Sequence, residues 1–387
     1  MAKSQIIISF FLLFVFKLTA QINLRGTVYF DNKPKSDVTV YLNNTTIGAI
    51  TDNNGEFNLE VNNGVYELII SHIGFKTMKY NFDTSNYTKP LVFSLLEEEV
   101  VLDEVVIKEK KNNDEWEHNF SVFFREFMGT TKFSKSCTIQ NPDVLFFEFD
   151  SENNILRAEA IEPLQIRNEA LGYDIFCDLK YFSVEKNNFK YLGYSYFLEL
   201  KGSKNKQKKW RKNRLKAYNG SPIHFYKSIL KNSSKEEGFV IDAFVRKKNK
   251  DKPSEEELLK ARKELSKSNV ILNFSRKHID YLYKSDIASS EIIHKENNKT
   301  YLKFDNNLRI TYLKEKQEKG YVLRYKSNPP IVALPQVSNI IPLTEKIIIS
   351  PQGILANPLN NVLYEEYWAY ERSAHALPLD YEPNYGN

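Results

Sequence analysis

The sequence has little cysteine, methionine or tryptophan, and it has no long hydrophobic run after its first twenty residues. Its 387 residues include 2 Cys, 3 Met and 3 Trp. Two cysteines, Cys137 and Cys177, are too few for a disulfide framework, and whether they form one bridge stays open. A membrane-spanning helix needs roughly 20 consecutive apolar residues. Disulfide-stapled scaffolds and helical membrane proteins are therefore excluded.

The histidines lack the spacing of a zinc hydrolase. None of the six is followed by Glu at the third position, and they are His72, His118, His224, His278, His294 and His375. His278-Ile279-Asp280 and His294-Lys295-Glu296 place a carboxylate two residues on, which does not suit one helical face. We predict no metal, no cofactor and no catalytic residue. His72 is expected to be a half-buried packing residue.

Tyrosine and phenylalanine are abundant, with 23 Tyr and 26 Phe. Both residue types suit the half-buried surface of a β-sheet. The chain is 42% hydrophobic and 27% charged, which is enough apolar material for two or three domains with real cores. The composition predicts a mainly β protein with a few helices.

The first twenty residues have the pattern of an export signal. Lys3 supplies a positive charge, residues 6–16 are almost wholly apolar, and Leu18-Thr19-Ala20 ends on a small residue. We predict a signal peptide over residues 1–20, with the mature chain starting at Gln21. The alternative, a retained membrane anchor, would need a longer apolar run. No Cys follows Ala20, so a lipid anchor has no support.

Charge is divided unevenly along the exported chain. Residues 21–107 hold six basic and twelve acidic residues, a net charge of −6, and residues 108–387 carry a net charge of +9. Opposite charges favour docking of the two parts on each other, or a polyanionic partner for the basic part. Both alternatives stay open, as does the interpretation that the division has no role.

Short strands and tight turns fill residues 21–107. Val38, Val40 and Leu42 alternate with polar residues, as on one face of a strand. Asn53-Asn54-Gly55 lies between two apolar segments and predicts a β-hairpin. Some seven strands of this kind indicate an antiparallel β-sandwich. The oxygens of Asp52, Asn54 and Glu56 fit turn chemistry better than a calcium loop, which needs six further residues and a closing Glu.

The same residues carry a resemblance to a known family. Its motifs are Gly26-Thr27-Val28, Pro34, Val38-Thr39-Val40, Thr51-Asp52-Asn53-Asn54-Gly55-Glu56-Phe57, Ser71-His72-Ile73-Gly74-Phe75 and Leu102-Asp103-Glu104-Val105-Val106-Ile107. This succession resembles the carboxypeptidase-like regulatory domain of Bacteroidetes cell-envelope proteins, which also stands at the front of many TonB-dependent outer-membrane receptors. The resemblance implies a prealbumin-like sandwich without catalytic residues, located in the periplasm or at the outer membrane or cell surface.

Residues 108–114 form a charged linker, and residues 115–387 are expected to form a larger β-rich α+β body. Helices are predicted near 114–128, 207–232 and 253–266. In the first, aromatic residues recur at helical spacing and predict a core-facing stripe, made of Trp116, Phe120, Phe123, Phe124 and Phe127. Strands are predicted to continue through Tyr321-Val322-Leu323. The tail around 364–372 is predicted to form a short helix.

Part of the body resembles a longer Bacteroidetes envelope family that carries the same front module and has no assigned reaction. The motifs are Ala170-Leu171-Gly172-Tyr173, Arg214-Leu215-Lys216-Ala217-Tyr218, Gly220-Ser221 and His224-Phe225. Ser221 lies three residues before His224, but Ser221-Pro222 is the order of a helix N-cap. We predict a capping serine rather than a nucleophile.

Residues 201–216 hold nine basic residues and no acidic one. The candidate contacts for an anionic partner are Lys208, Lys209, Trp210, Arg211 and Arg214. Basic runs with an aromatic residue suit phosphate groups or anionic lipid. Because export argues against nucleic acid, the candidate partners are lipopolysaccharide phosphates, a membrane surface or an acidic envelope protein. A solvated helix face is the alternative.

These observations favour a non-enzymatic exported envelope protein that binds a surface ligand or partner protein. One alternative is an exported hydrolase whose carboxylates meet only on folding, with Asp150, Glu159, Glu162 and Asp174 as candidates. Another is an accessory subunit of an outer-membrane transporter. A deep pocket with two carboxylates about 5–10 Å apart would favour the hydrolase, and an exposed sheet edge would favour binding.

Overall fold

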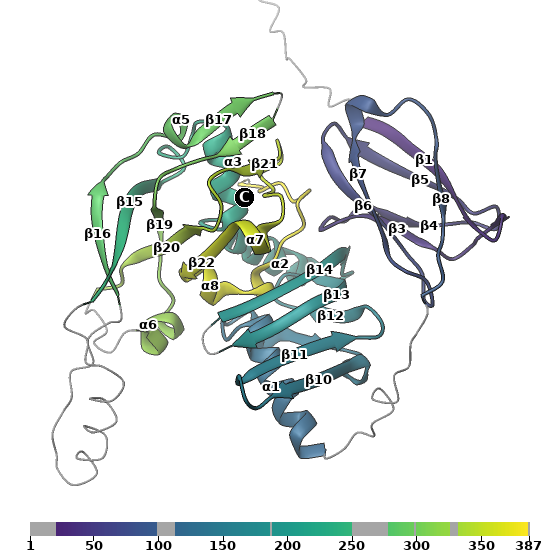
Figure 1. The fold of residues 1–387 in the computed structure, drawn as a ribbon, viewed down its shortest axis with the longest axis horizontal. Coiled ribbons are helices and arrows are strands. Elements are labelled where there is room, and N and C mark those ends of the chain that lie inside the picture. The colour runs from purple at the N-terminus through teal and green to yellow at the C-terminus, as the bar shows by residue number, and fades with distance from the viewer. Residues whose placement is uncertain are drawn as a thin grey trace, which may run out of the picture.

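The computed structural model describes residues 21–98, 113–185, 188–249, 278–297, 299–325 and 332–385. They form a sandwich at the N-terminal end and a body built on further antiparallel sheets (Figure 1). The predicted fold class, mainly β with a few helices behind an N-terminal sandwich, is confirmed. The predicted signal peptide, the strand 102–107 and the helix 253–266 lie outside the described residues.

The sandwich consists of two four-stranded sheets. In the first, β1 (Gln21–Phe30) pairs with β2 (Lys33–Pro34), β5 (Glu56–Asn62) and β8 (Leu91–Ser94). The second has the order β4 (Gly48–Ile50), β3 (Thr39–Leu42), β6 (Val65–Ser71), β7 (Met78–Asp83). Strand β5 buries every second residue, so Phe57, Leu59 and Val61 face the core while their neighbours face solvent. One pair, β1 with β8, is parallel.

The turn at Asp52 is present, but the predicted hairpin around it is wrong. Gly55 has φ +69°, a conformation that favours glycine, and its N–H donates to the carbonyl of Asp52 at 2.9 Å. The carboxylate of Asp52 accepts from the N–H groups of Asn54 and Glu56. Strands β4 and β5 on either side belong to different sheets. The turn therefore passes the chain across the sandwich instead of pairing its flanks.

The first sheet of the body packs against a long helix. Its order is β10 (Leu145–Asp150), β11 (Ile155–Ala160), β13 (Tyr173–Glu185), β12 (Leu164–Asn168), β9 (Cys137–Ile139), with β14 (Asn188–Glu199) also on β13. Helix α1 (Asn113–Met128) buries Phe123 and Phe127 in this core, and Phe120 and Phe124 pack at its margin. The indole of Trp116 donates to the carbonyl of Leu145. The predicted core-facing aromatic stripe is confirmed.

The second half of the body has two sheets. One has the order β16 (His278–Lys284), β15 (Phe239–Lys248), β19 (Asn307–Lys316), β20 (Pro335–Pro342), β22 (Val362–Glu366). The other has the order β17 (Ile293–Glu296), β18 (Lys299–Leu302), β21 (Ile347–Ile349). Their shared core includes residues of helix α3 (Pro222–Leu230). Short helices α5 (Ser289–Ile292) and α7 (Pro358–Asn361) also belong to this half.

Three further expectations are corrected or settled here. Tyr321-Val322-Leu323, predicted as a strand, lies in helix α6 (Lys319–Tyr325). Cys137 and Cys177 are both buried and free, so they form no bridge. The predicted short helix in the tail is present as α8 (Tyr367–Glu371).

The sandwich docks on the body mainly through hydrogen bonds. The loop after β3 lies along β14, where Asn44 N–H donates to Ser195 and Thr45 accepts from Phe197. Thr46 donates to Asp380 twice, from its N–H and its hydroxyl. No ion pair between described residues joins the two parts. Their opposite net charges therefore do not act through direct contacts in the described interface.

Candidate functional site

Helix α2 (Lys204–Tyr218) carries the basic run, and one of its faces anchors it to the body. Trp210 is 6% exposed, and its indole N–H donates to the carbonyl of Glu169 at 2.9 Å. Asn213 donates to the carbonyl of Ala170. Gly172 has φ +76°, and a Cβ there would lie 2.3 Å from the Trp210 ring. Only glycine fits both the backbone and the ring at this turn.

Arg214 is the second anchor of the helix. Its guanidinium donates to the carbonyls of Leu171 and Gly172 at 2.7 and 3.0 Å and to the Glu199 carboxylate at 2.8 Å. It also lies 3.9 Å from the centre of the Tyr173 ring. At 8% exposed, Arg214 is largely buried, and its donors are taken by these partners. Trp210 is buried too, so these two of the five candidate contacts anchor the helix.

Two of the sequence motifs that are distant along the chain lie together in the fold. The segment Ala170-Leu171-Gly172-Tyr173 and the segment that starts at Arg214 contact each other directly. The remaining motif residues, Gly220, Ser221 and His224, form contacts with one another. Ser221 caps α3 by accepting from the N–H of His224, as predicted. The imidazole of His224 accepts from Gly220 N–H, and burial lowers its pKa against the opposing effect of Glu237.

Apart from the exposed side chains of Asn205 and Gln207, the solvent-facing side of α2 is cationic. Lys208, Lys209 and Arg211, the other three candidate contacts, lie on it, and Lys204, Lys206 and Lys212 extend it. We call these six residues the α2 cationic face. None of them forms an ion pair with another residue that the structure describes. Among the described residues, therefore, no carboxylate neutralises this face.

The charges of this face work against the helix. Lys204 and Lys206 lie in the first turn, where the helix dipole disfavours cations. Lys208 lies four residues from both Lys204 and Lys212, and like charges at this spacing destabilise a helix by roughly 0.2–0.5 kcal/mol per pair. An anionic surface would remove this repulsion.

A small cleft of about 270 Å³ lies beside α2, lined by Arg211, Arg214 and the C-terminal segment. It also contains three carboxylates, and each already has a partner. Asp380 accepts from Thr46, Glu199 from Arg214, and Glu382 lies 3.4 Å from the ammonium of Lys227. Asp380 and Glu199 therefore hold parts of the structure together, whereas Glu382, with its side chain 79% exposed, forms only an exposed ion pair.

The four carboxylates of the hydrolase alternative do not converge. Asp150 pairs with Ile155 on β11, which pairs with Glu185 on β13. Asp174 lies eleven residues from Glu185 along β13, roughly 35 Å at the rise of a strand, and it binds Arg167. Glu159 and Glu162 are exposed and do not line the cleft beside α2. No group of three or more His, Cys, Asp and Glu among the described residues could hold a metal ion.

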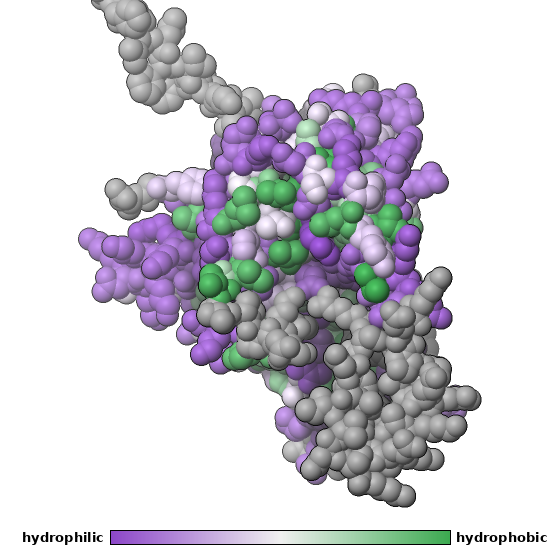
Figure 2. All heavy atoms as spheres, turned by 90° about the vertical axis from the view of Figure 1, so that its left-hand side faces the viewer, coloured by the Kyte–Doolittle hydropathy of each residue, from purple (hydrophilic) through white to green (hydrophobic). Residues whose placement is uncertain are grey.

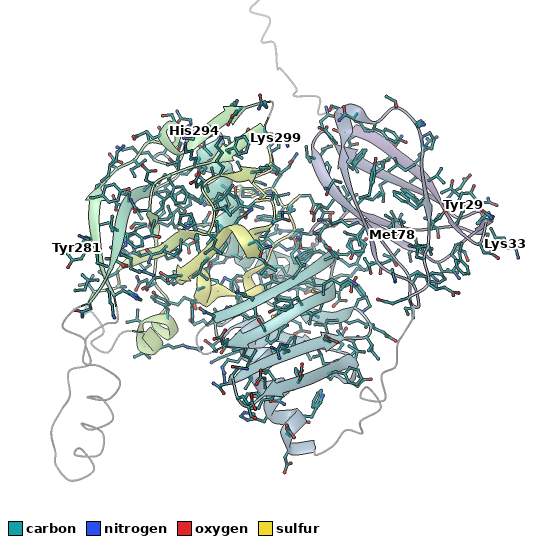
Figure 3. The ribbon with its side chains drawn as sticks, in the orientation of Figure 1. Tyr29, Lys33, Met78, Tyr281, His294 and Lys299 are labelled. Atoms are coloured by element: carbon teal, nitrogen blue, oxygen red, sulfur yellow. The ribbon has the colours of Figure 1, made fainter. Side chains whose placement is uncertain are left out.

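The other singled-out histidines are mostly peripheral. His72 is half-buried with its ring edge against Phe75, as predicted. His118 and His278 are exposed, and so is His294 on β17, at the rim of the body (Figure 3). Of the five histidines other than His224, His375 is the one that is deeply buried in the part of the chain that the structure describes, at 9% exposed.

Strand β16 is the outer strand of its sheet, and nothing among the described residues pairs with its free side. Its large side chains are at least one-third exposed, and they are Ile279, Tyr281, Leu282 and Tyr283. Figure 2 shows this side of the molecule, with green hydrophobic residues among the purple hydrophilic ones. An exposed edge can pair with an extended segment of another chain.

Comparison with known proteins places the front module in a family. Residues 24–107 match the family model described as CarboxypepD_reg-like domain, which confirms the resemblance of the sandwich. No curated protein matches the chain. No helix among the described residues has the length and apolar character to cross a membrane.

Two solved structures show partial similarity. One is a type II Cohesin-X-Dockerin complex from Acetivibrio cellulolyticus, with 22% identity and a TM-score of 0.18, over 19% of this chain and 57% of that chain. The other is a DUF3823 family protein from Bacteroides ovatus, with 10% identity and a TM-score of 0.17, over 47% of this chain and 83% of that chain.

Proposed function

We propose that this is a non-catalytic protein of the cell envelope that attaches to an anionic surface through the α2 cationic face. The CarboxypepD_reg-like match supports envelope residence, and the export signal predicted for residues 1–20 agrees with it. In this proposal residues 21–107 and 115–387 are two domains, and the sandwich helps to hold the body in place.

The observation that carries the proposal is the division of α2 into two faces. Trp210 and Arg214 fix one face to the body, so the backbone that carries the six cations of the other face is held in place. A phosphate-rich lipid surface suits such an array, because each Lys or Arg near an anionic membrane contributes about 1 kcal/mol. An acidic partner protein is the alternative outcome of the test.

The test is sedimentation of the full chain with vesicles, comparing phosphatidylglycerol mixed into phosphatidylcholine with phosphatidylcholine alone. We expect binding to the anionic vesicles only, and a decrease of about tenfold or more when Lys204, Lys208 and Lys212 are changed to Gln. Arg214 is left intact because its loss would unfold the anchor of α2.

A matched variant removes the same number of exposed lysines elsewhere. Lys33, Lys89 and Lys248 are exposed and lie outside α2. Changing all three to Gln should leave vesicle binding within about twofold of the original. Equal binding of the α2 variant and the unmodified chain would refute the lipid surface and direct the search to a protein partner.

A further inference from the structure

A second cleft lies where the two halves of the body meet, and it is lined by lysines from separate segments. Its volume is about 490 Å³. The lysines are Lys132 and Lys135 before β9, Lys216 at the end of α2, Lys316 at the end of β19 and Lys319 at the start of α6. We call this set the lysine groove. Ligand sites often lie at such junctions, and this volume is within their usual range.

The charge of the groove is not balanced by its described lining. Glu318 is the one acidic residue among the lining residues that the structure describes, and it binds Lys216 at 2.8 Å. Lys132, Lys135, Lys316 and Lys319 form no ion pair with a described carboxylate. Four cations around one cleft repel each other unless an anion lies among them.

Two further acidic residues lie close to the groove. Glu371 follows Tyr370, which lines the cleft, and it is 8% exposed. Burial raises the pKa of Glu371 well above its usual value and also raises the pKa of Glu315, which disfavours a negative charge on either carboxyl group. Among the described contacts, neither residue forms an ion pair with any of the four lysines.

We propose that the lysine groove binds a compact ligand with one or more phosphate groups. Lysine ammonium groups bind phosphate as point charges from several directions, which suits cations carried on separate segments. The cleft has room for a pyrophosphate or a phosphorylated headgroup. This site shares no residue with the α2 cationic face and does not depend on the function proposed for that face.

The experiment is calorimetric titration of the full chain with inorganic pyrophosphate at low salt. We expect saturable binding by the unmodified chain. In the double variant Lys316→Ala with Lys319→Ala, the affinity for pyrophosphate should fall about tenfold for each lost charge-assisted contact. Lys316→Arg with Lys319→Arg keeps both charges and should retain binding within a few-fold. Thermal melting should show that both variants remain folded, because exposed substitutions rarely alter stability by more than about 0.5 kcal/mol.

The control is Lys33→Ala with Lys89→Ala, on the sandwich, where Lys33 lies at the outer end (Figure 3). It removes two exposed lysines and should bind pyrophosphate like the unmodified chain. The proposal is overturned if the unmodified chain shows no saturable binding, or if the alanine variant binds as tightly as the control.

A second measurement distinguishes a lipid headgroup from a soluble phosphate compound as the ligand of the groove. If the groove takes a lipid headgroup, its alanine variant should also lose binding to phosphatidylglycerol vesicles. If it takes a soluble phosphate compound, only pyrophosphate binding should fall. Both results support the groove. The α2 proposal can fail without affecting this one. Changing Lys204, Lys208 and Lys212 to Gln should alter the affinity for pyrophosphate by no more than about threefold.

Discussion

Arg214 and Lys208 belong to the same basic run, yet they have opposite environments. Lys208 is exposed, and Arg214 is buried against the Leu171-Gly172 turn. The sequence contained a signal for this difference. Trp210, Arg214, Ala217 and Tyr218 are spaced as i, i+4, i+7 and i+8, which is one face of a helix, and all four are buried. Counting charges without this periodicity merged the two faces into one patch.

Replacing Arg214 by Ala should destabilise the protein by about 3–4 kcal/mol, because the change removes the donor to the buried Leu171 carbonyl, one of the two donors to the Gly172 carbonyl and the partner of Glu199. Arg214→Lys should recover less than half of the loss, since an ammonium cannot match the planar fork. Urea unfolding measures both effects. Arg211→Ala, on the exposed face of the same helix, is the control and should change stability by less than about 0.5 kcal/mol. Similar losses for Arg211 and Arg214 would contradict the division of α2.

At the scale of elements, alternation and turn residues located most strands, and errors occurred where local patterns fit two structures. The apolar flanks of the Asp52 turn suit a hairpin as well as a crossing between sheets, and only pairing with β3 and β1 decides. In α6, Tyr321 and Val322 have strand propensity, but Tyr321 is buried against Tyr367 and Tyr370. Tertiary packing overrides propensity there. The lysine groove was equally hidden, because its residues come together only in the fold.

Helix α8 has only five residues, and non-glycine residues with positive φ bound it on both sides. These are Glu366 at φ 64° and Arg372 at φ 55°. At its end, Glu371 and His375 face each other in the interior, with 3.4 Å between the carboxylate and Nδ1. Nε2 of His375 lies 3.0 Å from the hydroxyl of Thr131. Burial raises the pKa of Glu371 and lowers the pKa of His375 to about 3. Burial therefore favours the uncharged form of both groups in the folded protein.

This pair should make stability depend on pH in two windows. From pH 3 to about 4.5 the unfolded pair binds two protons and the folded pair one, so stability rises with pH. Between about 4.5 and 6.5 both states bind one proton and stability is level. Above 6.5 the unfolded pair binds none while the folded pair keeps one, so stability falls by up to about 1.4 kcal/mol per pH unit, until the pH passes the raised pKa of Glu371.

Urea unfolding of Glu371→Gln between pH 6 and 9 tests the upper window. The amide cannot ionise, so the fall above pH 6.5 should be smaller in this variant than in the unmodified chain. Glu382→Gln changes a carboxylate whose side chain is 79% exposed and should leave the fall unchanged. A Glu371→Gln profile parallel to that of the unmodified chain would show that Glu371 is ionised in the folded protein.

At the scale of the whole molecule, the charge division of the sequence suggested mutual docking, and the structure shows the two parts docked by other means. The described contacts include backbone pairing of Thr45 with β14, side-chain bonds to Asp178 and Asp380, and the packing of the Tyr41 ring on Tyr196. Backbone pairing cannot be deduced from net charge, because any residue offers an N–H and a carbonyl. The opposite charges still favour the approach of the two parts at long range.

Asp380 offers the sharpest test of this docking. Asp380→Ala removes the acceptor of both Thr46 donors, and we expect a loss of about 1–3 kcal/mol from the interface. Because the sandwich and the body have separate cores, the loss should split thermal unfolding into two transitions and increase the radius of gyration measured by small-angle X-ray scattering. Asp380→Asn keeps one acceptor oxygen, so its loss of interface stability should lie between those of the unmodified chain and Asp380→Ala. Glu382→Ala, two residues on, is the matched control and should keep the original profile. A single unaltered transition in Asp380→Ala would mean that the other contacts, including the pairing along β14 and the Thr77–Asp178 bond, suffice to hold the sandwich.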